Sequence, residues 1–155
     1  MMFNSLASRA VLGLTISTLS LGLGGSFAMA QGTPAAAAAT PAAAITYSAA
    51  QARRGSTAYR DNCSACHGDS LDGALDAPAL KGSAFQANWF GKSAGELYTF
   101  MSTNMPQDRP GELQPKQYAD IFAFLLKSNA VAAGPDNTPD LTADTIAAAS
   151  MPAAK

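Results

Sequence analysis

The stretch Cys63-Ser64-Ala65-Cys66-His67 contains both cysteines and the single histidine of the 155-residue chain. Two cysteines at this spacing lie too close in sequence for an ordinary structural disulfide. On one helical turn, however, their thiols can add to the two vinyl groups on one edge of a haem, and the next residue can direct its imidazole at the iron. We therefore predict one covalently bound haem c, attached through Cys63 and Cys66 and ligated by His67.

Two other interpretations of the same residues have less support. A redox-active dithiol of the thioredoxin type should follow a strand in a βαβ unit, and no strand pattern precedes Cys63. A structural zinc site needs four ligands, whereas the chain has no Cys or His beyond Cys63, Cys66 and His67. Haem attachment is the interpretation that uses all three residues.

The second axial ligand of the iron cannot be another histidine, since His67 is the only one in the chain. The methionines beyond residue 30 are Met101, Met105 and Met151. Met101 lies on the apolar face of a predicted helix and is expected in the core, and Met151 lies in a segment that is poor in bulky side chains. Met105 directly precedes Pro106, which disfavours helical backbone and places it at the start of a loop. We predict Met105 as the axial ligand, with an open position as the alternative.

The spacing of apolar residues around the motif predicts an all-α fold with three main helices. Few β-branched aliphatic residues follow residue 30, and no alternating strand pattern of useful length is present. One helix is expected over 48–62, a second from Ser93 to Asn104, and a third from Pro115. The apolar face of the third consists of Tyr118, Ile121, Phe122 and Leu125.

The segment between residues 68 and 92 contains Gly, Asp and Pro with isolated large side chains, which predicts a loop. Such a loop cannot form a core of its own. We expect it to pack on an apolar group that the protein binds.

Residues 1–30 have the three-part layout of a secretory signal peptide. Arg9 supplies a positive charge, a short apolar stretch follows, and Ala28-Met29-Ala30 forms a cleavage site of small residues. Glycine and polar residues interrupt the apolar stretch, which makes an uncleaved membrane anchor the less favoured alternative. We expect export to the periplasm and cleavage after Ala30.

The rest of the chain divides by composition. Residues 31–45 are rich in Ala, Thr and Pro and predict a tether. Residues 132–155 are poor in bulky side chains and are expected to form a flexible tail. The packed domain is therefore expected over 46–131, a size at which a small core usually needs a cofactor, metal or disulfide for stability.

The charge of the chain excludes one class of partner. The formal net charge is −1, and the basic residues are scattered apart from the pair Arg53-Arg54. This pattern offers no electrostatic footprint for nucleic acid.

Together these residues resemble class I c-type cytochromes, small helical proteins with one covalently bound haem. The resemblance extends from Ala49 to Asn129. It rests on Gly55 and Tyr59, the haem motif followed by Gly68, Ala77-Pro78-Ala79-Leu80, Met105-Pro106 and the aromatic final helix. It departs from the family at Ala77, where many members have glycine.

The resemblance implies roles for further residues. The Pro78 carbonyl would accept a hydrogen bond from the His67 imidazole and fix the orientation of the ring. Leu80 and Trp89 would line the haem pocket, although plain core packing explains Trp89 equally well. Gly55 and Tyr59 of the first helix would pack against aromatic residues of the last, which are Tyr118 and Phe122.

A narrower resemblance concerns residues 100–120, which are similar to the cytochrome domains associated with bacterial quinoprotein alcohol dehydrogenases. It implies a periplasmic electron carrier rather than an enzyme, with a periplasmic dehydrogenase as donor. The acceptor would be a membrane oxidase or another cytochrome of a respiratory chain. Two alternatives stay open: a fixed haem subunit of a quinoprotein dehydrogenase complex, and a haem protein with an open iron site that binds small ligands or reacts with peroxide.

Overall fold

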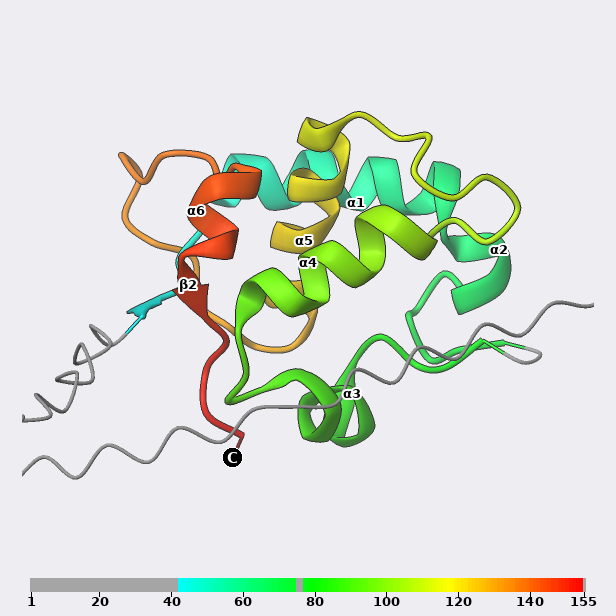
Figure 1. The fold of residues 1–155 in the computed structure, drawn as a ribbon, viewed down its shortest axis with the longest axis horizontal. Helices are drawn as coiled ribbons and strands as arrows, with labels where there is room; N and C mark the ends of the chain where they lie inside the picture. Colours follow the sequence, from blue (N-terminus) through cyan, green and yellow to red (C-terminus); the bar gives the residue numbers. More distant parts are fainter. Residues whose placement is uncertain (1–41, 75–76, 155) are drawn as a thin grey trace, which may run out of the picture. The chain divides into compact units, whose positions relative to one another are not determined.

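The computed structural model describes residues 42–74 and 77–154. The predicted signal peptide and most of the predicted tether lie outside the described residues. Helices dominate the described part, as expected for an all-α fold, and the only strands in it are two residues long (Figure 1). The elements in chain order are β1 (Ala43–Ala44), α1 (Ala49–Asn62), α2 (Ser64–His67), α3 (Gly82–Trp89), α4 (Ala94–Asn104), α5 (Pro115–Ser128), α6 (Ala143–Ala147) and β2 (Ala149–Ser150).

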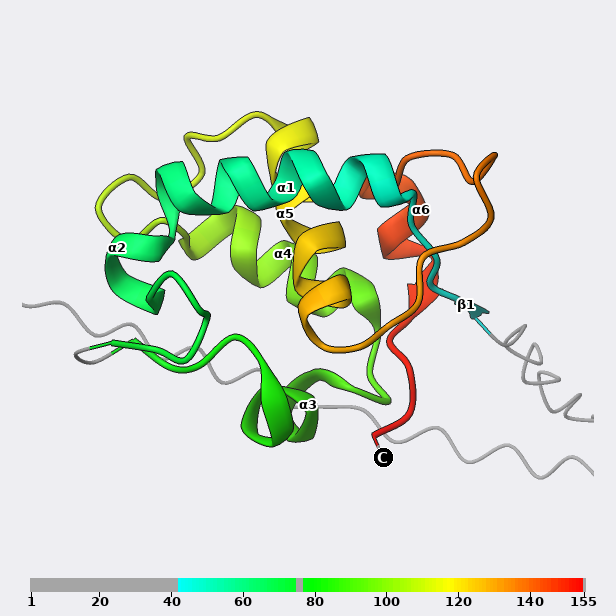
Figure 2. The ribbon, with the colours of Figure 1, turned by 180° about the vertical axis from the view of Figure 1, so that it is seen from behind.

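The three predicted helices are present as α1, α4 and α5 (Figure 2). The Ser48 hydroxyl caps α1 by accepting a hydrogen bond from the backbone N–H of Gln51 at 3.0 Å. Ser93 caps α4 in the same way through the N–H of Gly95. Pro115 occupies the first turn of α5, where its missing N–H is not needed.

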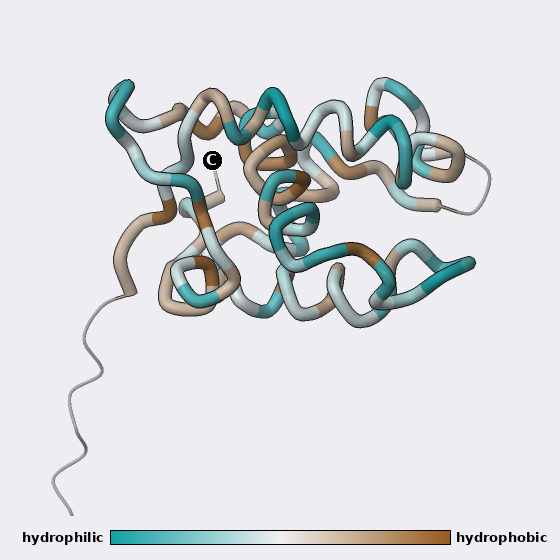
Figure 3. The backbone as a smooth tube through the Cα atoms, turned by 90° about the horizontal axis from the view of Figure 1, so that it is seen from above, coloured by the Kyte–Doolittle hydropathy of each residue, from teal (hydrophilic) through white to brown (hydrophobic). Residues whose placement is uncertain are grey.

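Apolar side chains of the described residues form one core cluster. In Figure 3 several hydrophobic stretches lie toward the middle of the domain, whereas turns at its edge are hydrophilic. No helix among the described residues is both long and apolar enough to cross a membrane. The largest fully buried side chains are Tyr47, Gln51, Tyr59, Phe122, Leu126 and Ile146.

Helices α1 and α5 pack closely because Gly55 lacks a side chain. A Cβ atom at this position would overlap the backbone carbonyl of Asp120 and lie 3.0 Å from Cβ of Phe124. One turn further along α1, the ring of Tyr59 lies 5.3 Å from that of Phe124, measured between centroids. The expected partners Tyr118 and Phe122 are therefore wrong for Gly55 and Tyr59, because residues two positions apart on α5 project from different faces.

The segment between residues 68 and 92 is not a loop throughout, since α3 forms within it. Phe85 and Trp89 stand one turn apart on α3, and Phe85 and Phe90 are buried in the core. A helix of only two turns leaves too short an apolar repeat to stand out from the surrounding loop residues.

The expectation of a flexible tail is wrong for residues 132–154, the part of this segment that the structure describes. This segment forms α6 and β2, and Leu141, Ile146 and Met151 are buried in the core. The three side chains are five residues apart, which matches neither the helical nor the strand period. For that reason the apolar pattern gave no signal, and the domain does not end at residue 131.

The end of the predicted tether also packs against the domain. Ala43 and Ala44 of β1 pair in parallel with Ala149 and Ser150 of β2. The next residue, Ile45, is buried, and its N–H donates to the carbonyl of Ser150 at 3.2 Å. Backbone hydrogen bonds thus join the first and last segments of the described chain.

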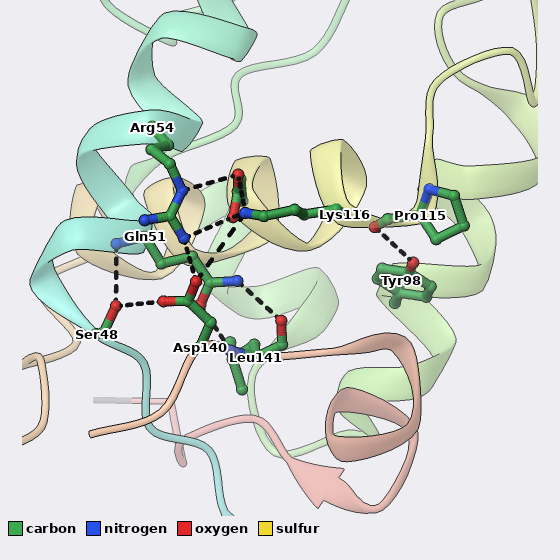
Figure 4. Close-up of polar contacts among 9 residues, drawn as sticks. Ser48, Gln51, Arg54, Tyr98, Pro115, Lys116, Asp140 and Leu141 are labelled. Atoms are coloured by element: carbon green, nitrogen blue, oxygen red, sulfur yellow. Dashed lines mark hydrogen bonds and ion pairs between the residues drawn. The ribbon is translucent and has the colours of Figure 1, made fainter. Parts of the chain in front are cut away.

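A buried glutamine fastens the C-terminal segment to α1 (Figure 4). Gln51 is 0% exposed, its Nε2 donates to the carbonyl of Leu141 at 2.9 Å, and its Oε1 accepts from the N–H of Leu141 at 2.7 Å. Both backbone polar groups of the buried residue Leu141 are thereby satisfied.

Ion pairs next to Gln51 join α1 both to α5 and to the C-terminal segment (Figure 4). The buried Asp120 carboxylate of α5 accepts from Arg54 at 3.2 Å and from Lys116 at 3.0 Å. Arg54 also pairs with Asp140, and the Ser48 hydroxyl donates to Asp140 at 2.7 Å. The Ser48 hydrogen bond, followed by the positive charges of Arg54 and Lys116, lowers the pKa of Asp140.

We expect Asp140→Asn to lower the free energy of unfolding at pH 7 by less than about 1 kcal/mol, because its pair with Arg54 is largely exposed. The folded-state pKa of Asp140 lies below its unfolded value, so the contribution is complete above the unfolded pKa and is lost as pH falls through the folded pKa. The difference between wild type and variant should stay constant from pH 7 to about pH 5 and shrink below about pH 4. Urea unfolding of wild type and Asp140→Asn across this pH range measures the difference, with Asp136→Asn as the control. A difference that persists at about pH 2 would contradict the prediction.

Candidate haem-binding site

The cysteine-histidine motif forms the helical turn that haem attachment requires. Cys63 ends α1, where its N–H donates to the carbonyl of Tyr59 at 2.8 Å. The carbonyl of Cys63 then accepts from the N–H groups of Cys66 and His67 at 3.2 and 3.0 Å, which closes α2 as a single turn. Tyr59 supports this turn, since its hydroxyl donates to the carbonyl of Gly68 at 2.7 Å.

The two thiols are free and differ in environment. Cys63 is half-buried and Cys66 is exposed. Burial raises the pKa of the Cys63 thiol to about 11, against a smaller lowering by the charge of Arg109.

His67 is held in the tautomer that suits a metal ligand. The side chain is 9% exposed, and its Nδ1 lies 2.8 Å from the carbonyl oxygen of Pro78. A carbonyl oxygen can only accept, so Nδ1 carries the proton, and in the neutral imidazole Nε2 then keeps the lone pair. The hydrogen bond that the resemblance implied for Pro78 is thus present, and the chemistry of His67 fits an iron ligand.

A tight turn after α2 brings Pro78 back to His67. The N–H of Gly73 donates to the carbonyl of His67 at 3.0 Å, and the N–H of Leu80 donates to that of Leu71 at 2.9 Å. Gly73 has a φ of +81°, and a Cβ atom there would lie 2.6 Å from the carbonyl oxygen of Ala77. Only glycine fits this position without strain.

Met105 lies where the sequence placed it, directly after α4. Its backbone is extended, with φ −123° and ψ 149°, and its N–H donates to the carbonyl of Met101 at 3.0 Å. Met101 is buried in the core, as predicted. Residues 105–114 connect α4 to α5, and we call them the Met105 loop.

The predicted pocket residues Leu80 and Trp89 are half-buried and border the core. Trp89 packs on Phe100, with ring centroids 5.7 Å apart, and the Lys92 ammonium lies 6.0 Å from the Trp89 ring. Phe100 is 44% exposed and is the one large apolar side chain among the described residues that is largely exposed. These rings offer apolar surface to a flat apolar ligand.

Three side chains support this region without a signal in the sequence. Asn129 at the end of α5 accepts from the N–H of Gly82 at 3.1 Å and donates to the carbonyl of Leu80 at 3.0 Å. The hydroxyl of Tyr118 donates to the carbonyl of Met105 at 2.6 Å, and Arg109 donates to Asn62 at 3.0 Å. Each pair lies far apart in sequence, so no local pattern could indicate it.

The described residues contain no group of three or more His, Cys, Asp or Glu side chains that could hold a metal ion. The donor set consists of two thiols and one oriented imidazole on a single turn.

The helical fold and the turn that carries Cys63, Cys66 and His67 define a c-type cytochrome domain. Residues 50–125 match the family model described as cytochrome c oxidase, cbb3-type, subunit III. This part of the chain belongs to the class I c-type cytochromes. Membership of this family implies covalently bound haem c and electron transfer.

Among solved structures, the chain is similar to the sulfane dehydrogenase SoxCD from Paracoccus pantotrophus. The two share 24% sequence identity with a TM-score of 0.49, over 86% of this chain and 69% of the SoxCD chain. These values are too low to support a shared activity or partner. No curated protein matches the sequence.

Proposed function

We propose that this protein is a periplasmic electron carrier with a single haem c. Cys63 and Cys66 would hold the haem through thioether bonds, and His67 and Met105 would be its axial ligands. The observation that carries the proposal is the hydrogen bond from Nδ1 of His67 to the carbonyl of Pro78, because it leaves Nε2 with a lone pair for iron.

The bound haem would supply one-electron redox chemistry, and the protein would supply ligation, burial and orientation. The Pro78 carbonyl keeps the imidazole of His67 fixed and raises its basicity. Methionine as the other ligand favours a comparatively high reduction potential. With one His and one Met ligand retained in both oxidation states, little in the protein needs to rearrange on electron transfer.

The proposed donor is a periplasmic dehydrogenase, and the proposed acceptor is a membrane oxidase or another cytochrome. The resemblance of residues 100–120 to dehydrogenase-associated cytochrome domains supports this, as does the signal-peptide pattern of residues 1–30. Carriers of this kind exchange partners through small, weak interfaces. Co-purification with a dehydrogenase at stoichiometric amounts would instead favour a fixed subunit.

The axial assignment is tested with Met105→Leu in protein expressed with haem-attachment machinery. We expect ferric wild type to show the weak near-infrared band of methionine-to-iron ligation and the variant to lose it completely, because leucine has no sulfur. Met101→Leu, which changes the other methionine of this region at a buried position, should keep the band. A band that survives in Met105→Leu, or is absent from wild type, would show that Met105 is not the ligand.

A further inference from the structure

Tyr118 connects α5 to the residue proposed as axial ligand. Its side chain is 3% exposed, and its hydroxyl donates to the backbone carbonyl of Met105 at 2.6 Å. Because α5 is packed along α1, this hydrogen bond ties the start of the Met105 loop to the most firmly packed helix pair of the domain.

Arg109 connects the middle of the same loop to the other side of the site. Its Nη2 donates to Oδ1 of Asn62 at 3.0 Å, and Nδ2 of Asn62 donates in turn to the carbonyl of Ala58 at 2.8 Å. Asn62 is the last residue of α1 and directly precedes Cys63. The loop is therefore attached to the helix end that carries the proposed haem-binding turn.

We propose that Tyr118 and Arg109 are positioning residues that hold the Met105 loop in place, so that the Met105 sulfur stays on the haem iron. This inference rests on the proposed ligation by Met105. The loop has no helix or strand of its own. Movement of its backbone would carry the Met105 sulfur away from the iron. Both hydrogen bonds oppose that movement.

The physical argument concerns the population of molecules in which Met105 is detached. An added ligand such as imidazole binds ferric iron only in that population, so its apparent affinity rises in proportion to the detached fraction. A typical hydrogen bond contributes enough stability to change such a fraction about fivefold. The Arg109 contact, which is only partly buried, should have a smaller effect, about twofold.

The test is a titration of the ferric, haem-loaded protein with imidazole, followed in the visible spectrum. Tyr118→Phe keeps the buried ring and removes only the hydroxyl, and we expect it to bind imidazole about fivefold more tightly than wild type. Arg109→Gln, at a half-buried position, should bind it about twofold more tightly. If Tyr118→Phe does not load haem, Arg109→Gln still tests whether a hydrogen bond of the Met105 loop affects imidazole binding.

A matched control is available in Tyr98→Phe. The hydroxyl of Tyr98 donates to the carbonyl of Pro115 at 3.2 Å and makes no bond to the Met105 loop. Its removal should leave the imidazole affinity within about twofold of wild type. An equal rise in Tyr98→Phe and Tyr118→Phe would overturn the inference, as would wild-type affinity in both Tyr118→Phe and Arg109→Gln.

Combination with Met105→Leu separates this inference from the proposed function. If Tyr118 acts through Met105, then Tyr118→Phe should no longer change the imidazole affinity in a Met105→Leu background. If Met105→Leu loses the near-infrared band but the loop variants behave as wild type, only the positioning role fails. If Met105→Leu keeps the band, the axial ligation itself fails.

Discussion

Replacement of Gly55 by alanine is expected to destabilise the haem-loaded protein by about 3 kcal/mol or more. The new Cβ atom would overlap the carbonyl of Asp120 on α5, and a backbone group cannot rotate away as a side chain can. Relief requires α1 and α5 to separate, and these helices form the main packed pair of the domain. Helix propensity acts in the opposite direction, but alanine gains only about 1 kcal/mol over glycine.

The free energy of unfolding in urea measures this effect. Thr57→Ala, two residues further along α1 at an exposed position, is the control and should be neutral or slightly stabilising. Since small domains are stable by only about 5–15 kcal/mol, Gly55→Ala should also lower the yield of folded protein. If Gly55→Ala were as stable as Thr57→Ala, the close crossing of α1 and α5 would be wrong.

Replacement of Ile146 by alanine is expected to lower the free energy of unfolding by about 3 kcal/mol. Ile146 is 0% exposed in α6, which packs against α4 and α5. The loss combines the transfer free energy of the removed atoms with the cavity that they leave. If this segment were a flexible tail, as its composition predicts, the substitution would not change the free energy of unfolding.

The effect of Ile146→Ala is measured in urea beside Ala148→Ser, a substitution at an exposed position that follows α6. Ala148→Ser should remain within about 0.5 kcal/mol of wild type. Equal stability of the two variants would mean that the C-terminal segment does not contribute to the core. A large loss confined to Ile146→Ala would show that the domain extends beyond residue 131.

The predictions from sequence succeeded where neighbouring residues carry the information. The helices α1 and α4 were predicted with nearly correct ends and α5 with its correct start, because capping residues and apolar spacing act within a few positions. The exit of Met105 from α4 followed from Pro106 alone. The turn that presents Cys63, Cys66 and His67 was likewise predicted from their spacing.

The errors concern segments whose stability comes from distant contacts. Residues 132–154 have few bulky side chains, yet Leu141, Ile146 and Met151 are buried in the core, and Gln51 satisfies the backbone polar groups of Leu141. The partner of Gly55 was misassigned because the choice between two faces of α5 depends on how the helices cross. The amino-acid composition indicates neither the contacts of the C-terminal segment nor the contact of Gly55 with α5.

The sequence by itself determined the class of protein and the chemistry available to it, because the haem motif and the methionine before proline are local patterns with a definite covalent or conformational meaning. The tertiary structure alone decided which groups support those residues. The hydroxyl of Tyr118 donates to the carbonyl of Met105, and Arg109 donates to Asn62, only because the helices bring them together. Hydrogen bonds of this kind join positions distant in the chain, and their geometry exists only once the core is packed.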